Sequence, residues 1–296
     1  MPDPGNVGSV ELIWLADADD TVLPLLTAVQ AADGVPEIPA DGTLPPDFRT
    51  GRHLVARDDR GTVGYAHVDE RGDSFGNKIV ELFVHPGHRR QGIGSALVDE
   101  VLTIDSPLRL WSHRDHPGAA RIAAARNLER VRELYQMRLD NSVELPAPTS
   151  PRDGITLRTF VPGQDEQGMV DVNKRAFDWH PEQGMLTVAD VVAAEKESWF
   201  DADGFFLAVD ADDTVVGFHW TKVHPDGTGE VYVVGIHPDA QGGGLGRALT
   251  LAGLHHLREK NVPEIILYVE SDNAPALAVY TRLGFTLQYT NVAYQR

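Results

Sequence analysis

Short apolar runs and amphipathic stretches alternate along this chain of 296 residues. Apolar or alternating runs of about four to eight residues are typical of strands, whereas apolar residues spaced three or four apart are typical of helices. In the first half this pattern predicts strands at Glu11–Leu15, His53–Arg57, Thr62–Val68, Ile79–Val84, Leu108–Trp111 and Val131–Met137, and helices at Gly92–Leu102 and Ala119–Arg126. The stretch between the first two strands, up to about Arg49, is compatible with helices or loops.

The second half repeats this order of elements. Its pattern predicts strands at Thr156–Phe160, Phe205–Val209, Val215–Lys222, Glu230–Ile236, Ile265–Val269 and Thr286–Ala293, and helices at Asp165–Phe177, Val188–Phe200, Leu245–Glu259 and Ala274–Leu283. Each half is therefore predicted to be an α/β unit that begins with antiparallel strands and continues as a β-α-β-α-β run.

A proline-containing stretch separates the two halves. Asn141–Gly154 has three prolines and little periodicity, which is typical of a linker. We therefore expect an N-terminal domain over residues 1–140, a linker over residues 141–154 and a C-terminal domain over residues 155–296.

The same glycine-rich turn occurs once in each half. Val84-His85-Pro86 and Ile236-His237-Pro238 close predicted strands, and Gly92-Ile93-Gly94 and Gly244-Leu245-Gly246 open predicted helices. A repeat at about half the chain length indicates a duplicated domain. Glycines between a strand and a helix allow backbone N–H groups to close around an anion such as a phosphate. The order Gly-x-Gly-x-x-Gly is missing, which excludes the dinucleotide fingerprint, and no Gly-Lys-Ser/Thr ends the turn as in a P-loop.

Composition and charge narrow the chemistry. The formal net charge of −18 argues against a nucleic-acid partner, and the absence of cysteine excludes disulfides, thiolate ligands and a cysteine nucleophile. His113 with His116, and His255 with His256, lack carboxylates at metal-ligand spacing, so we expect no metal. No apolar run reaches the length of a membrane span and the first residues do not resemble a signal peptide. We therefore expect a cytoplasmic monomer without a membrane partner.

Two motifs of the second half carry a family resemblance. They are the turn Gln241–Gly246 and the pattern Asn273-x-x-Ala-x-x-x-Tyr-x-x-x-Gly-Phe285, and the first half has a matching turn at Arg89–Gly94. Together they resemble the acetyl-CoA motifs of the GCN5-related N-acetyltransferases (GNAT). The resemblance implies an acetyl-CoA-dependent N-acetyltransferase of the α/β class, with two tandem GNAT domains that each have a mixed, mostly antiparallel sheet flanked by helices. The first half keeps a worn form of the second motif, with Asn127-Leu128 in place of Gly-Phe.

The resemblance assigns acid–base chemistry to the second half. It implies Glu230 as the base that accepts the proton of the amine, directly or through water, and Tyr280 as the acid that protonates the leaving thiolate. Aligned on the motifs, the first half has Lys78 and Ala123 at these positions. Glu81 lies three residues along its strand, an odd step that predicts the opposite face. We therefore expect the first half to be non-catalytic.

The resemblance also implies which residues contact acetyl-CoA, the co-substrate. Backbone groups at the strand ends would pair with the pantetheine arm, and the glycine turns would hold the pyrophosphate. In the first half these residues are Leu82, Phe83, Val84, Arg89, Arg90, Gln91, Gly92, Ile93 and Gly94. In the second half they are Val234, Gly235, Ile236, Gln241, Gly242, Gly243, Gly244, Leu245, Gly246 and Arg247, with Asn273 near the acyl end.

A closer resemblance covers nearly the whole chain. The stretches Arg132–Arg138, Phe177–Gly184, Gly217–Pro225 and Gly229–Val233 resemble a branch of the family that has two such units in tandem. That branch acetylates the cysteinyl amine of cysteinyl-glucosaminyl-inositol, which implies a small-molecule amine as acceptor. The matching substrate contacts are Asp41, Glu182, Lys222, Glu230 and Tyr268, with Glu37 as the alternative to Asp41.

Two other functions stay open on the sequence. The chain could be a tandem acetyltransferase for another amine, such as an aminoglycoside or a peptide N-terminus. It could also be an acetyl-CoA-binding regulatory module without turnover, although Glu230 and Tyr280 weigh against that reading.

Overall fold

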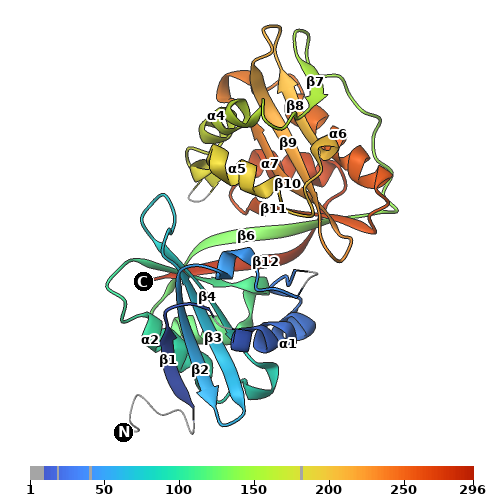
Figure 1. Ribbon diagram of the computed structural model, residues 1–296. Coiled ribbons are helices and arrows are strands. Elements are labelled where there is room, and N and C mark those ends of the chain that lie inside the picture. The colour runs from blue at the N-terminus through green and yellow to red at the C-terminus, as the bar shows by residue number, and fades with distance from the viewer. Residues whose placement is uncertain (1–9, 19, 40–41, 181–182) are drawn as a thin grey trace. The chain divides into compact units, whose positions relative to one another are not determined.

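The computed structural model describes residues 10–18, 20–39, 42–180 and 183–296 (Figure 1). The chain forms two compact units, which are described separately. The N-terminal unit comprises Met1–Glu133 together with Thr290–Arg296, and the C-terminal unit comprises Leu134–Tyr289. Within the described ranges, no helix is both long and apolar enough to cross a membrane.

A mixed sheet organises the N-terminal unit. Its neighbouring strands are β1 (Glu11–Leu15), β2 (Arg52–Asp58), β3 (Gly61–Asp69), β4 (Lys78–Val84), β5 (Leu108–Ser112) and β12 (Thr286–Gln295). Neighbours run antiparallel except β4 and β5, which are parallel. Helix α1 (Leu23–Asp33) packs against Tyr65 and Phe83 on one face, and α2 (Ile93–Val101) and α3 (Pro117–Ala124) pack on the other.

The C-terminal unit repeats this plan. Its neighbouring strands are β6 (Glu129–Asp140), β11 (Glu264–Glu270), β10 (Gly229–Ile236), β9 (Val215–Val223), β8 (Phe205–Val209) and β7 (Thr156–Thr159). Only β10 and β11 are parallel among the pairs described. Helices α4 (Glu166–Ala176) and α5 (Val188–Ala194) pack on the face of Trp220, and α6 (Leu245–Glu259) and α7 (Ala274–Arg282) pack on the other. The expected fold class is confirmed, although the helix expected at Val188–Phe200 ends at Ala194.

The last strand of each half belongs to the sheet of the other half. Residues 134–140 of β6 pair with β11 in the C-terminal unit, and Val292–Tyr294 of β12 pair with β5 in the N-terminal unit. The observed units therefore differ from the expected boundaries at residues 140 and 155. Since both strands have a similar alternating pattern, the sequence does not reveal which sheet each one joins.

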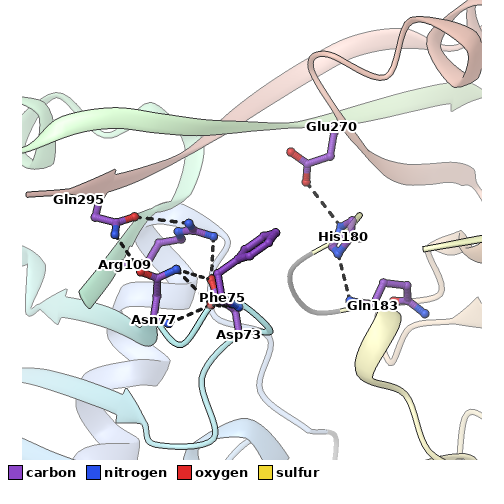
Figure 2. A network of polar contacts seen from close by, with 8 residues as sticks. All are labelled: Asp73, Phe75, Asn77, Arg109, His180, Gln183, Glu270 and Gln295. Carbon is purple, nitrogen blue, oxygen red and sulfur yellow. Dashed lines mark hydrogen bonds and ion pairs between the residues drawn. The ribbon is translucent and has the colours of Figure 1, made fainter. Parts of the chain in front are cut away.

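A buried polar network ties the end of β12 to the N-terminal unit. Asp73 accepts hydrogen bonds from the backbone N–H groups of Phe75 (3.0 Å) and Asn77 (2.9 Å) and forms an ion pair with Arg109 (2.8 Å) (Figure 2). The amide of Gln295 donates to the side-chain oxygen of Asn77 (2.8 Å). Because the Asp73 carboxylate is fully buried, loss of one partner would leave a charge without compensation.

The expected linker packs against helix α6 of the C-terminal unit. Residues 141–154 contain no helix or strand, yet Val143 and Leu145 contact the core of that unit. The guanidinium of Arg258 donates to the carbonyl oxygen of Val143 (3.0 Å), and His255 lies 2.9 Å from the carbonyl oxygen of Pro146. The segment is therefore a docked part of the C-terminal unit.

Helix α6 approaches β9 closely at Gly253. The buried ring of His219 lies against this glycine, with its Nδ1 2.8 Å from the carbonyl oxygen of Leu249. Burial lowers the pKa of His219 to about 4, so the ring is neutral at pH 7. An alanine Cβ at Gly253 would lie 2.1 Å from the ring, closer than any atoms pack.

We expect Gly253→Ala to lower the free energy of unfolding by about 1–3 kcal/mol, as overpacked cores do. This loss would outweigh the gain of roughly 0.5–1 kcal/mol that Ala normally brings to a helix interior. Gly246→Ala on the same helix is the control, because its Cβ would meet only the end of the Ile236 side chain at 3.1 Å. Urea unfolding of both variants measures the difference. Equal stability of the two variants would contradict the packing argument.

Candidate active site

The glycine turn of the C-terminal unit has an open backbone. Gly242, Gly243 and Gly244 all have positive φ angles (87°, 57° and 78°), which L side chains rarely adopt. A Cβ on Gly242 or Gly244 would meet no atom within 4 Å. The turn leads directly into α6, whose first N–H groups have no partner within the helix. This geometry suits the binding of a phosphate group.

A linker arginine lies beside this turn. A Cβ on Gly243 would come within 3.1 Å of Cδ of Arg152, so the absence of a side chain there leaves room for the stem of Arg152. The guanidinium follows Cδ by one bond and therefore places a cation near the turn. No sequence motif marks Arg152, since it precedes the turn by about ninety residues in the chain.

The turn of the N-terminal unit keeps part of this geometry. Arg90 takes the left-handed conformation of Gly242 (φ 62°), and Gly92 that of Gly244 (φ 89°). Arg89 forms two hydrogen bonds with the Asp33 carboxylate at the end of α1 (3.0 and 2.5 Å). Its guanidinium is therefore already neutralised by an internal partner.

The parallel strands separate before the glycine turn in both units. The pairing of β10 with β11 ends at Val231 and Leu267, whereas β10 continues to Ile236. The pairing of β4 with β5 ends at Glu81 and Trp111, whereas β4 continues to Val84. On the edges that face β11 and β5, the last residues of β10 and β4 are therefore outside the described strand pairing. These are the residues where pantetheine contacts are expected.

Strand β10 has a β-bulge that β4 lacks. The register of β10 shifts between Val231 and Val233, so Tyr232 is an extra residue, whereas the pairs of β3 and β4 are regular. The paired positions of the two units can be counted from the glycine turn toward the start of β10 and of β4. The position of Glu230 in β10, opposite Lys222, then corresponds to that of Ile79 in β4, opposite Asp69.

The bulge corrects one expectation about the N-terminal unit. Because one residue of β10 lies outside the ladder, Glu81 lies on the same face as Glu230 and not on the opposite one. Glu81 lies two paired positions closer to its glycine turn than the position that corresponds to Glu230. Its Oε2 lies 3.4 Å from Nε2 of His113. Burial opposes ionisation of Glu81, but the charge of His113 and its hydrogen bond outweigh burial and lower the pKa of Glu81. The position that corresponds to Glu230 itself has the apolar Ile79.

Glu230 is a buried carboxylate on the face of β10 that α4 and α5 cover. It is 5% exposed, and its Oε2 lies 2.7 Å from Nε2 of His224. Lys222 lies opposite on β9, with Nζ 5.1 Å from the ring centre of Trp199 and 5.6 Å from that of Tyr232. The buried carboxyl group of Glu230 is thus in contact with His224, and Lys222 occupies the opposite position on the neighbouring strand.

Tyr280 lies on α7, in the motif that begins with Asn273. The side chain of Asn273 caps this helix by accepting from the N–H of Ala276 (3.2 Å). Tyr280 packs against the core cluster that contains Val231, and burial raises its pKa to about 12. The phenol therefore keeps its proton at neutral pH, as an acid requires.

Backbone geometry places Ala123 at the position of Tyr280 in the N-terminal unit. Leu128 donates to the carbonyl oxygen of Ala123 and Phe285 to that of Tyr280, both at 3.0 Å. Asn127 has a φ of 54°, in the left-handed region that Gly284 also occupies. The diverged motif of the first half thus has the same backbone geometry as the second, but Ala123 lacks the hydroxyl group that Tyr280 has.

The remaining expected substrate contacts are only partly described. Asp41 and Glu182 lie outside the described residues. Tyr268 on β11 is 41% exposed and accepts a hydrogen bond from Gln136 (2.6 Å). Glu37, the alternative to Asp41, is exposed in the N-terminal unit.

A second histidine–glutamate pair of the C-terminal unit lies at the end of β11 (Figure 2). Nδ1 of His180 accepts from the N–H of Gln183 (3.0 Å), so Nε2 carries the proton that faces Glu270 at 3.6 Å. Glu270 is 8% exposed. The pair connects the end of β11 with His180, which follows α4. Among the described residues, no group of three or more His, Asp or Glu side chains is arranged to hold a metal ion.

Comparisons with known proteins agree with this geometry. The model of the "Acetyltransferase (GNAT) family" matches residues 170–285, and that of the "Acetyltransferase (GNAT) domain" matches residues 49–136. A protein named mycothiol acetyltransferase from Saccharomonospora viridis is 55% identical over 94% of this chain and 95% of its own length. Another of that name, from Amycolatopsis mediterranei, is 53% identical over 96% of this chain and 98% of its own length. The chain belongs to the mycothiol acetyltransferase family. It is an acetyltransferase with two GNAT units.

Solved structures share the fold of this mycothiol acetyltransferase family member. A GCN5-related N-acetyltransferase from Sphaerobacter thermophilus superposes with a TM-score of 0.73 at 24% identity, covering 96% of this chain and 95% of that chain. A tandem GNAT protein from the clavulanic acid biosynthesis pathway gives a TM-score of 0.68 at 22% identity, covering 97% of both chains. These likenesses extend over both units and support the tandem fold.

Proposed function

We propose that the chain transfers the acetyl group of acetyl-CoA to the cysteinyl amine of 1D-myo-inositol 2-(L-cysteinylamino)-2-deoxy-α-D-glucopyranoside, giving mycothiol and CoA. The identity of 53–55% with mycothiol acetyltransferases over nearly the whole chain supports this acceptor. The observation that carries the chemistry is the buried Glu230 on β10, one residue before the point at which β10 and β11 part.

In the proposed reaction, Glu230 accepts a proton from the amine, directly or through water. Acetyl-CoA supplies the acyl group as a thioester. The amine nitrogen forms a bond to the carbonyl carbon, the carbon–sulfur bond breaks, and the hydroxyl of Tyr280 gives its proton to the thiolate. A backbone N–H near Val234 polarises the carbonyl oxygen, as an oxyanion hole does.

The proposed binding sites follow from the sequence and the open backbone. We assign the pantetheine arm to Val234, Gly235 and Ile236 and the pyrophosphate to Gln241–Arg247, with Asn273 near the acyl end. The corresponding turn Arg89–Gly94 would bind a second acetyl-CoA without turnover. Acceptor contacts would come from Lys222, Tyr268, Glu182 and either Asp41 or Glu37. We further propose a cytoplasmic monomer.

The deciding experiment measures acetyl transfer from acetyl-CoA to the cysteinyl-glucosaminyl-inositol acceptor. Free cysteine and glucosamine, an aminoglycoside and a short peptide are the matched alternatives. We expect kcat/KM to be highest for the cysteinyl-glucosaminyl-inositol compound, because only this acceptor joins the cysteinyl amine to the glucosaminyl-inositol group. Equal or faster transfer to another amine would contradict the proposed acceptor, and absence of transfer to every amine would support a non-catalytic module.

A further inference from the structure

His224 is the nearest described partner of the proposed base. It follows β9 in the turn between β9 and β10, where its N–H donates to the carbonyl oxygen of Thr228 (2.8 Å) and its carbonyl oxygen accepts from Gly227 (2.9 Å). Asp226 also accepts from the N–H of Thr228 (2.8 Å). The backbone of the turn is thus fixed by its own hydrogen bonds, and the imidazole reaches back along the hairpin to Glu230.

The distance between the two side chains requires a proton between them. Nε2 of His224 and Oε2 of Glu230 are 2.7 Å apart, and two lone pairs would repel at that separation. An Nε2–H group that donates to an ionised carboxylate meets this requirement. The side chains of His224 and Glu230 are only 13% and 7% exposed, so water can replace little of this bond.

We propose that His224 is a positioning residue for Glu230. By occupying Oε2, it holds the carboxylate in one orientation and leaves Oε1 to accept the proton of the acceptor amine. Hydrogen bonds to an ionised carboxylate are among the stronger ones, so this contact holds the carboxylate firmly. This inference rests on the proposed function, because it assumes that Glu230 is the base.

Lys222, the other cation near Glu230, has a different environment. Its Nζ lies over the rings of Trp199 and Tyr232, and its place on β9 is opposite Glu230 in the ladder. The short contact to Oε2 comes from His224, not from this lysine. Removal of the imidazole should therefore free one carboxylate oxygen while Lys222 and the acetyl-CoA turn keep their surroundings.

The experiment compares His224→Ala, His224→Gln and His224→Asn. We expect His224→Ala to lower kcat about 10- to 100-fold, because the variant loses a buried hydrogen bond to a charged group. The amide nitrogen of Gln can take the place of Nε2, whereas that of Asn is too close to the backbone and mimics Nδ1. We therefore expect Gln to restore much of the rate and Asn to restore little. KM for acetyl-CoA and its Kd by calorimetry should change less than threefold.

A double-mutant cycle separates positioning from a general loss of structure. If His224 acts through Glu230, adding His224→Ala to Glu230→Gln should cause almost no further loss of kcat. His256→Ala is the matched control, since His256 forms a similar pair with Asp201 (3.0 Å) and its side chain is also 13% exposed. That variant should keep the wild-type kcat. Circular dichroism spectra and unfolding midpoints confirm that each variant is folded.

Several outcomes would overturn the inference. They are full kcat in His224→Ala, equal rates in the Gln and Asn variants, or losses that multiply with Glu230→Gln. If His224→Ala does not fold, the comparison of Gln with Asn decides alone. If Glu230→Gln lowers kcat but the changes at His224 do not, the role of His224 is refuted and the proposed function stays intact. If neither Glu230→Gln nor the changes at His224 lower kcat, the proposed base is refuted as well.

Discussion

Gly244→Trp should abolish acetyl transfer, and Gly92→Trp should leave the chemical step largely intact. A side chain at Gly244 points into open space beside the turn, where the pyrophosphate is proposed to lie. An indole ring on this Cβ would compete with the phosphates for the space beside the turn. Gly92 opens α2 as Gly244 opens α6, and their φ angles of 89° and 78° match closely. Both substitutions therefore impose similar backbone strain, which separates strain from loss of binding.

Steady-state rates and calorimetry test this prediction together. The wild type should bind two equivalents of acetyl-CoA and each variant one, but only the variant with intact Gly244 should turn over. A transfer reaction that survives Gly244→Trp and is lost in Gly92→Trp would assign catalysis to the N-terminal unit. A single equivalent in the wild type, lost only on altering Gly244, would restrict cofactor binding to the C-terminal unit.

Glu230→Gln should lower kcat about 10²- to 10⁴-fold near neutral pH, the usual contribution of a general base. Glutamine keeps the shape of the side chain but cannot accept the proton. The loss should shrink as the pH rises, because an α-amine has a reference pKa of about 7.7–8.0 and then supplies its own free base. A pH series of kcat for both enzymes measures this convergence.

Glu81→Gln is the matched control for the base. Glu81 lies on the same face of its sheet and also has a histidine partner, but the N-terminal unit has Ala123 in place of Tyr280. We expect this variant to retain the wild-type kcat. Full turnover of Glu230→Gln at mildly acidic pH would place the base elsewhere, and a large loss in Glu81→Gln would point to the N-terminal unit.

The motifs of the sequence predict much of the fold, whereas the catalytic residues stay a prediction. The nearly continuous apolar runs locate β4 and β10 almost to the residue, because helices cover both faces of each sheet. The paired glycine turns reveal the duplication, and the matching hydrogen bonds at Ala123 and Tyr280 confirm the alignment of the second motif.

Features that depend on how strands pair with one another were not predictable from the sequence. The bulge at Tyr232 has no signature in the sequence, so the side on which Glu81 lies was wrongly expected. His224 precedes Glu230 by six residues, and only the closed hairpin turn brings the two together. The sheet that each final strand joins is decided by tertiary packing, since β6 and β12 offer similar alternating faces.

The exchange of final strands has a consequence for synthesis of the chain on the ribosome. Residues 290–296 emerge after the whole C-terminal unit, yet they complete the sheet of the unit that emerges first. Until then, the edge of β5 at Leu110–Ser112 lacks its neighbour, and an open edge can pair with other chains. The N-terminal unit is thus held in an unfinished state during translation. A chain that stalls before residue 290 would keep this edge exposed and be open to recognition by chaperones and proteases.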